Sequence, residues 1–225
     1  AIAGHMLEVS ADDLEFRDGR GHVRGAEHHS VSLREVAHAA YRAHELPDGV
    51  EAGLDVQATY DPPEFSFSYA ANAAWVQVDP DTGQVRVEDF WMVHDAGRVI
   101  NPMIVDGQLT GGLLQGLGQA LMEELVYDEQ GQMLNGTLMD YLIPTAQEVP
   151  RIHLFHEVTP SPFQPEGIKG LGEAGTIAAP STIANAVLDA IRPLGITIHQ
   201  LPIRPSAIVE ANILRRKRTC SSNDW

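Results

Sequence analysis

A glycine-rich loop, Gly167-Ile-Lys-Gly-Leu-Gly-Glu-Ala-Gly-Thr176, contains a single carboxylate, Glu173, and is the stretch of this chain best suited to chemistry. Glycine lets a backbone pass close to a large ligand and adopt positive φ without steric cost. A proline-rich run precedes the loop, and an apolar segment that follows it predicts a helix over residues 176–191. We therefore take Glu173 as the candidate catalytic residue.

Two other interpretations of this loop have to be weighed. Gly170-Leu-Gly-Glu-Ala-Gly175 also matches the G-x-G-x-x-G pattern of a dinucleotide-binding turn. That turn needs a buried strand directly before its first glycine, and the prolines of residues 159–166 cannot pair inside a sheet. A carboxylate would also repel the pyrophosphate. In the second interpretation, Glu173 only stabilises the start of a helix through the helix dipole.

A second glycine-rich segment begins at Asn101-Pro102 and predicts a long helix through Leu125. It contains Gly107, Gly111, Gly112, Gly116 and Gly118. Each glycine inside a helix costs roughly 1 kcal/mol relative to alanine, so these positions need a reason. That reason is either tight packing against another backbone or the approach of a ligand.

The remaining elements follow from local patterns. Ser32-x-x-Glu35 is a capping box that predicts a helix over residues 33–43. Alternating residues predict strands at 54–60, 73–78, 85–93 and 152–158, and a hairpin at 14–24. Within 85–93, the run Phe90-Trp-Met-Val93 is typical of a strand that is buried on both faces.

Composition limits the classes of partner. The 225 residues have a formal net charge of -16 and a pI near 4.8, which argues against nucleic acid and anionic membranes as partners. No apolar run is long enough to span a membrane, and we expect a cytoplasmic protein. Cys220 is the only cysteine, so this chain alone builds no disulfide and no cysteine-ligated metal site. Its histidines are scattered, and we expect the close pairs His28-His29 and His153-x-x-His156 to be solvated rather than metal ligands.

Several motifs in the same order along the chain resemble one family. These motifs are Asn101-Pro-Met-Ile-Val-Asp-Gly-Gln-Leu-Thr-Gly-Gly112, Gln115-Gly-Leu-Gly118, Met139-Asp-Tyr-Leu142 with Pro144-Thr145, and Lys169-Gly-Leu-Gly-Glu173. With them, the chain resembles the C-terminal part of the molybdenum-binding subunit of the xanthine dehydrogenase and aldehyde oxidase family of molybdenum hydroxylases.

The resemblance implies a reaction and a set of site residues. It implies hydroxylation of an electron-poor carbon, in an aldehyde, purine or N-heterocycle, with oxygen derived from water and with Glu173 as general base. Gln108 is implied to lie near the pterin, where an amide offers both a donor and an acceptor; otherwise it is only a polar surface residue of the helix. Lys169, Gly170, Leu171 and Gly172 are implied cofactor neighbours, and no protein side chain is expected to ligate the metal.

The resemblance also implies cofactors and partners. The cofactor is molybdopterin with molybdenum, in its cytosine dinucleotide form, and 2Fe-2S clusters and FAD are expected on partner chains or domains. The remaining lobe of the molybdenum-binding subunit is a further expected partner, and activity requires these partners. A non-catalytic lobe that serves only assembly is the alternative.

The fold class expected is α+β, with mixed or antiparallel sheets and helices packed on them. Residues 1–212 are expected to form the C-terminal cofactor-binding lobe, with a division into subdomains near residue 100. Residues 213–225 are expected to form a polar tail.

Overall fold

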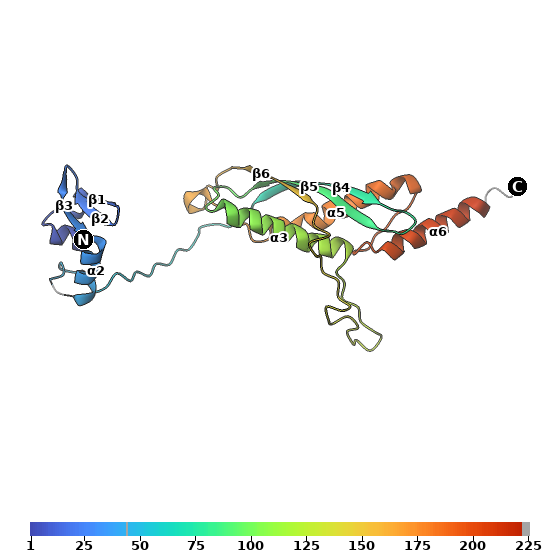
Figure 1. Ribbon diagram of the computed structural model, residues 1–225, viewed down its shortest axis with the longest axis horizontal. Coiled ribbons are helices and arrows are strands. Elements are labelled where there is room, and N and C mark those ends of the chain that lie inside the picture. Colours follow the sequence, from blue (N-terminus) through green and yellow to red (C-terminus); the bar gives the residue numbers. More distant parts are fainter. Residues whose placement is uncertain (44, 222–225) are drawn as a thin grey trace. The chain divides into compact units, whose positions relative to one another are not determined.

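The computed structural model describes residues 1–43 and 45–221, and they form two compact units. These are Ala1–Asp61, in blue, and Pro62–Trp225, in cyan to red (Figure 1). The division follows Asp61, whereas the sequence analysis placed it near residue 100. The reason is long-range pairing, because a strand of residues 85–95 bonds to one at 151–157 and so belongs to the second unit. The expected α+β class is confirmed.

The first unit is a small sheet with two helices. Strands β1 (Leu14–Arg17), β2 (Arg20–Val23) and β3 (Ala26–Ser32) pair antiparallel in that order. Helix α1 (Ile2–Met6) and the short 3-10 helix η1 (Ala11–Asp13) precede the strands, and helix α2 (Leu33–Arg42) follows them. The core of this unit is made of Ile2, Ala3, Leu14, Val31, Val36 and Ala40.

Two of the three elements predicted from local sequence patterns in this unit are confirmed. The capping box of α2 is present, since Ser32 Oγ accepts from the Glu35 amide and Glu35 Oε2 accepts from the Ser32 amide. The hairpin at 14–24 is also confirmed, and β3 extends it to a third strand. The strand expected at 54–60 is wrong, because those residues are unpaired and largely exposed in the described structure.

The second unit is built around a mixed sheet with the order β4-β5-β6. Strand β4 (Tyr69–Val78) pairs antiparallel with β5 (Val85–Asp95), and β6 (Arg151–Glu157) pairs parallel with β5. Alternation gives the sheet two faces. One face carries Phe90 and Met92 and packs on the helices as the main core. The opposite face, here called the outer face, carries Tyr69, Ala71, Ala73, Trp75, Asp89, Trp91, Val93, Arg151, His153 and Phe155, as the pairing register dictates.

Helices cover the core face of this sheet. Helix α3 (Pro102–Leu121) lies beside it in the ribbon, in green, and α5 (Ala179–Ile191) packs on β4 (Figure 1). The other elements are η2 (Pro165–Gly167), α4 (Ala174–Ile177), η3 (Arg192–Leu194) and α6 (Pro205–Ser221). Because α6 continues to Ser221, the segment expected to be a polar tail from residue 213 begins as helix. Within residues 1–43 and 45–221, no helix combines the length and apolar character needed to cross a membrane.

The glycines of α3 fall into two groups. A Cβ on Gly112 would lie 2.8 Å from the Gly175 Cα, and one on Gly116 would lie 2.6 Å from the Ala179 Cβ. Gly118 is likewise crowded, by Glu123 and Pro144. At Gly107 and Gly111, by contrast, no atom lies within 4 Å of the added Cβ. Tight packing therefore explains three of these glycines and leaves Gly107 and Gly111 without a reason in the described structure.

This difference predicts opposite effects of one substitution at adjacent positions. Gly112→Ala should lower the free energy of unfolding by about 1–3 kcal/mol, because the new methyl group meets backbone atoms that cannot move aside. Gly111→Ala should raise it by up to about 1 kcal/mol, because alanine favours helix and the space is open. Urea unfolding followed by the fluorescence of Trp75 and Trp91 measures both. Equal effects at the two positions would contradict the packing described here.

Candidate functional site

The loop that carries Glu173 is anchored to the end of β5 by a buried ion pair. Lys169 Nζ lies 3.0 Å from Asp95 Oδ2, and only 6% of the Lys169 side chain is exposed. The ammonium group also lies 4.7 Å from the centroid of the Tyr69 ring, at cation–π distance. The other Asp95 oxygen accepts from the amides of Gly97 (2.8 Å) and Thr159 (3.1 Å). Burial raises the pKa of Asp95, but the hydrogen bonds outweigh it and hold the pKa well below its usual range.

Backbone contacts reinforce this anchor. The Lys169 amide donates to the Ala96 carbonyl (3.0 Å), and the Arg98 amide donates to the Gly167 carbonyl (3.1 Å). Gly97 has φ +63°, and a Cβ there would lie 2.2 Å from the Gly167 oxygen, so only glycine fits. The start of the glycine-rich loop is therefore fixed to the sheet on two sides of Gly97.

The other side of the loop is held by α3. Gln108 Nε2 donates to the Gly172 carbonyl at 2.6 Å, from a position 64 residues earlier in the chain. Just beyond this bond the backbones of α3 and the loop come into close contact. A Cβ on Gly175 would lie 2.5 Å from the Leu109 carbonyl oxygen. Since the Gln108 amide nitrogen is used in this bond, its side-chain oxygen remains as an acceptor.

Glu173 itself lies between these two anchors and is exposed. It is the N-cap residue of α4, but its side chain makes no capping hydrogen bond. The dry, glycine-walled surroundings expected for it are not formed by residues 1–43 and 45–221. The described residues therefore fix the backbone around Glu173 and leave its side chain exposed.

An open helix face lies next to this loop. Ile104, Gly107, Gln108, Gly111 and Gln115 recur at the spacing that places them on one side of α3. All five residues are exposed, and no side chain covers the backbone at the two glycines. A flat or phosphate-bearing group could approach the first half of α3 here, near the positive end of the helix.

Comparison with known proteins identifies the family. The profile of the molybdopterin cofactor-binding domain matches residues 1–150. The chain belongs to this family. The expected resemblance to a molybdenum-binding subunit is confirmed. Residues 1–150 include all of α3 with Gln108, whereas the Glu173 loop lies beyond them.

Relatives of this molybdopterin cofactor-binding chain are much longer than it is. The chain is 41% identical over 212 residues to the nicotine 6-hydroxylase large subunit of Paenarthrobacter nicotinovorans, covering 94% of this chain and 26% of that protein. It is 39% identical over 201 residues to the carbon monoxide dehydrogenase large chain of Hydrogenophaga pseudoflava, covering 89% and 25%. The crystal structure of quinoline 2-oxidoreductase from Pseudomonas putida 86 superposes with a TM-score of 0.80 at 45% identity, over 94% of this chain and 27% of that one. The chain thus spans about a quarter of the length of these relatives.

The predicted site residues of this molybdopterin cofactor-binding chain fall into two groups. Gln108 and the exposed Gly172 are hydrogen-bonded next to Glu173, and the exposed Gly170 lies in the same loop. Lys169 instead directs its ammonium group to Asp95, and Leu171 packs against the main core. Sequence reasoning missed Asp95 and Tyr69 as anchors. The available signal was an aspartate at the end of an apolar strand, followed by a small residue and glycine.

The two histidines expected to be solvated on β6 have partners. His153 Nε2 lies 2.9 Å from Asp89 Oδ1, and His156 Nε2 lies 2.9 Å from Asp106 Oδ1 on α3. They lie on opposite faces of the sheet, as strand alternation predicts. On the core face next to His156, His94 is almost fully buried, and neither ring nitrogen has a partner among the described residues.

His94 predicts a pH dependence of stability. Burial lowers its pKa, the nearby His156 and Lys169 lower it further, and Asp95 opposes them. The unfolded chain, with a histidine pKa of about 6.5, then binds protons more readily than the folded one, so stability should fall as the pH drops below about 6.5. His94→Phe should flatten this slope below about pH 6.5 in urea unfolding. The exposed His199→Asn is the control, and an equal change in both variants would exclude His94 as the source.

Proposed function

We propose that this chain forms the Glu173-bearing wall of a molybdenum hydroxylase, which hydroxylates an electron-poor carbon with oxygen derived from water. The observation that carries the proposal is a carboxylate on a loop whose backbone is held from both sides, by Asp95 with Lys169 and by Gln108, while the carboxylate itself stays exposed. A general base needs this combination of fixed position and access to the group it deprotonates. Family membership and a relative named as a hydroxylase support the reaction class.

The fit of this chain to a pterin cofactor rests on the open face of α3. Gln108 has an acceptor oxygen to offer, and Gly107 and Gly111 allow a ring or phosphate to approach the backbone. When bound, molybdopterin with molybdenum supplies the redox and oxygen-transfer chemistry. Gly170, Leu171 and Gly172 form the neighbouring backbone, and Lys169 supports the site by positioning it rather than by contact through its ammonium group. We extend the proposal to the cytosine dinucleotide form of the pterin.

The proposed role of Glu173 is to accept the proton of the water-derived hydroxyl group as that oxygen reaches the substrate carbon. Its position next to the Gln108–Gly172 hydrogen bond keeps it beside the face proposed for the cofactor. Relatives named for nicotine and carbon monoxide, and a structure named for quinoline, support N-heterocycles and other small electron-poor molecules as the substrate class.

The proposed partners are the remaining lobe of a molybdenum-binding subunit and chains or domains that carry 2Fe-2S clusters and FAD. Names such as large subunit and large chain among the relatives support a complex of several subunits. We place this complex in the cytoplasm. The alternative, a lobe that serves only assembly, is supported by the tight packing between α3 and the loop at Gly112 and Gly175, which needs no cofactor.

Metal and pterin analysis tests the proposal. The chain is purified with the proteins that co-purify from its native source, and molybdenum, iron, flavin and nucleotide released from the pterin are measured. Molybdenum near one atom per chain, with iron, FAD and CMP, is the expected result. A complex that contains all partner chains but no molybdenum would favour the assembly role.

A further inference from the structure

The outer face of the β4-β5-β6 sheet carries several exposed apolar side chains beside one charged cluster, and helices cover only the opposite face. Trp75 is 65% exposed, Phe155 52% and Val93 39%. Ala71 and Ala73 lie between them, opposite Val93 and Trp91 in the antiparallel register. When one face of a sheet is in water, the side chains of that face are usually polar, and these side chains are not.

The sequence of β5 points to a second layer. Phe90-Trp-Met-Val93 is the pattern of a strand buried on both faces, and the parallel pairing of β5 with β6 is itself typical of sheets covered on both sides. Of these four residues, only Phe90 and Met92 are completely buried in the described structure. Val93 and its neighbour Phe155 are therefore apolar residues of the kind found in a core, but no second layer of the described structure covers them.

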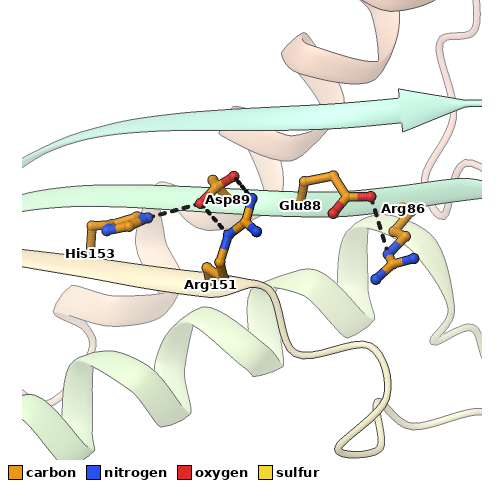
Figure 2. A network of polar contacts seen from close by, with 5 residues as sticks. All are labelled: Arg86, Glu88, Asp89, Arg151 and His153. Carbon is orange, nitrogen blue, oxygen red and sulfur yellow. Dashed lines mark hydrogen bonds and ion pairs between the residues drawn. The ribbon is translucent and has the colours of Figure 1, made fainter.

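The charged groups of the outer face are already paired with one another. Arg151 donates to both oxygens of Asp89, through Nε (2.9 Å) and Nη2 (2.6 Å), and His153 bonds the same carboxylate (Figure 2). The His153 ring also stacks on Trp91, with centroids 5.2 Å apart. Hydrogen bonds from Arg151 and His153 hold the pKa of Asp89 well below its usual range. A paired carboxylate costs less to cover than a free one, so this face can be buried without leaving an uncompensated charge.

We propose that the outer face is the docking surface for the complementary lobe of a molybdenum-binding subunit, the part that corresponds to the remaining length of the relatives. The chain covers only 26% of the nicotine 6-hydroxylase large subunit and 27% of the quinoline 2-oxidoreductase chain, so such a lobe has to be accommodated. A second copy of this chain is a poorer occupant, because two chains of net charge -16 repel each other. The inference rests on the proposed function only for the identity of the lobe.

Hydroxyl-radical footprinting of the isolated chain and of the complex purified from the native source tests the surface. Trp75, Phe155 and Tyr69 should label strongly in the isolated chain and lose most of their labelling in the complex. Equal labelling in both would overturn the proposal. Protection that rises with the concentration of the isolated chain, together with a dimer in sedimentation, would also overturn it, by naming a second copy as occupant.

A matched pair of variants localises the contact. Val93→Asp with Phe155→Asp should reduce the co-purified lobe by about tenfold or more, because an unpaired carboxylate would be buried in the interface. Ile213→Asp, which changes an exposed residue of α6 that is 46% accessible, is the control and should leave co-purification intact. Unchanged circular dichroism of the isolated variants shows that they fold. Equal losses from both variants would overturn the assignment to the outer face.

The outcomes separate this inference from the proposed function. Protection of the outer face in a complex without molybdenum would support the docking surface and reject the hydroxylase. Molybdenum with an unprotected outer face would do the reverse.

Discussion

Glu173→Gln should lower kcat of the assembled, cofactor-loaded complex by about 100- to 10,000-fold, the usual contribution of a general base. Glutamine keeps the size of the side chain but cannot accept the proton. The loop should stay in place, since its anchors at Asp95 and Gln108 do not involve the Glu173 side chain. Steady-state kinetics with an N-heterocycle measure the loss, and molybdenum content should be unchanged.

A second carboxylate serves as control for this variant. Glu166 is also exposed and precedes the same loop, where it pairs with Arg98. Glu166→Gln should leave kcat within about twofold, because removing a surface ion pair changes little. Full activity of Glu173→Gln at full molybdenum content would reject the general-base role and favour a lobe that serves assembly.

Lys169→Met should lower the free energy of unfolding of the second unit by about 3–5 kcal/mol, because it leaves the Asp95 charge buried and uncompensated. Both side chains are well buried, at 6% and 12% exposure. Urea unfolding followed by the fluorescence of Trp75 and Trp91 measures the loss. The double variant Asp95→Asn with Lys169→Met should recover part of it, because no charge then remains buried.

A more exposed ion pair in the same sheet is the matched control, and its carboxylate keeps a second partner in His153. Arg151→Met breaks the pair with Asp89, but the Arg151 side chain is 71% exposed, so the cost should stay below about 1 kcal/mol. If Lys169→Met costs no more than Arg151→Met, the buried pair is not the main anchor of the loop.

Much of the local structure could be predicted because the interacting residues are close in sequence. The capping box of α2 joins Ser32 and Glu35, and α3 starts where Asn101 accepts from the Ile104 amide and Pro102 follows. The strand pair β4-β5 is likewise joined by a short connection. The strand expected at 54–60 failed for the opposite reason. Its alternation is real, but a strand needs a partner, and the described chain supplies none.

The candidate site was predicted in its parts and not in its arrangement. The family resemblance implied that Gln108 and the Glu173 loop serve one site, and the hydrogen bond from Gln108 to Gly172 joins the two segments. The roles these residues play in chemistry stay predictions. The burial expected around Glu173 is absent from the described structure, where its side chain is exposed.

By itself, the sequence determined the fold class and the family, since these depend on short-range spacing and on motifs in order, and it supplied the candidate site residues as predictions. Only the tertiary structure decided that Lys169 pairs with Asp95, 74 positions away, and that Gly112 is crowded while Gly111 is open. It also decided which face of β5 is left uncovered. The physical reason is the same in each case: the atoms that set the energy of these groups come from distant segments, and only folding brings them into contact.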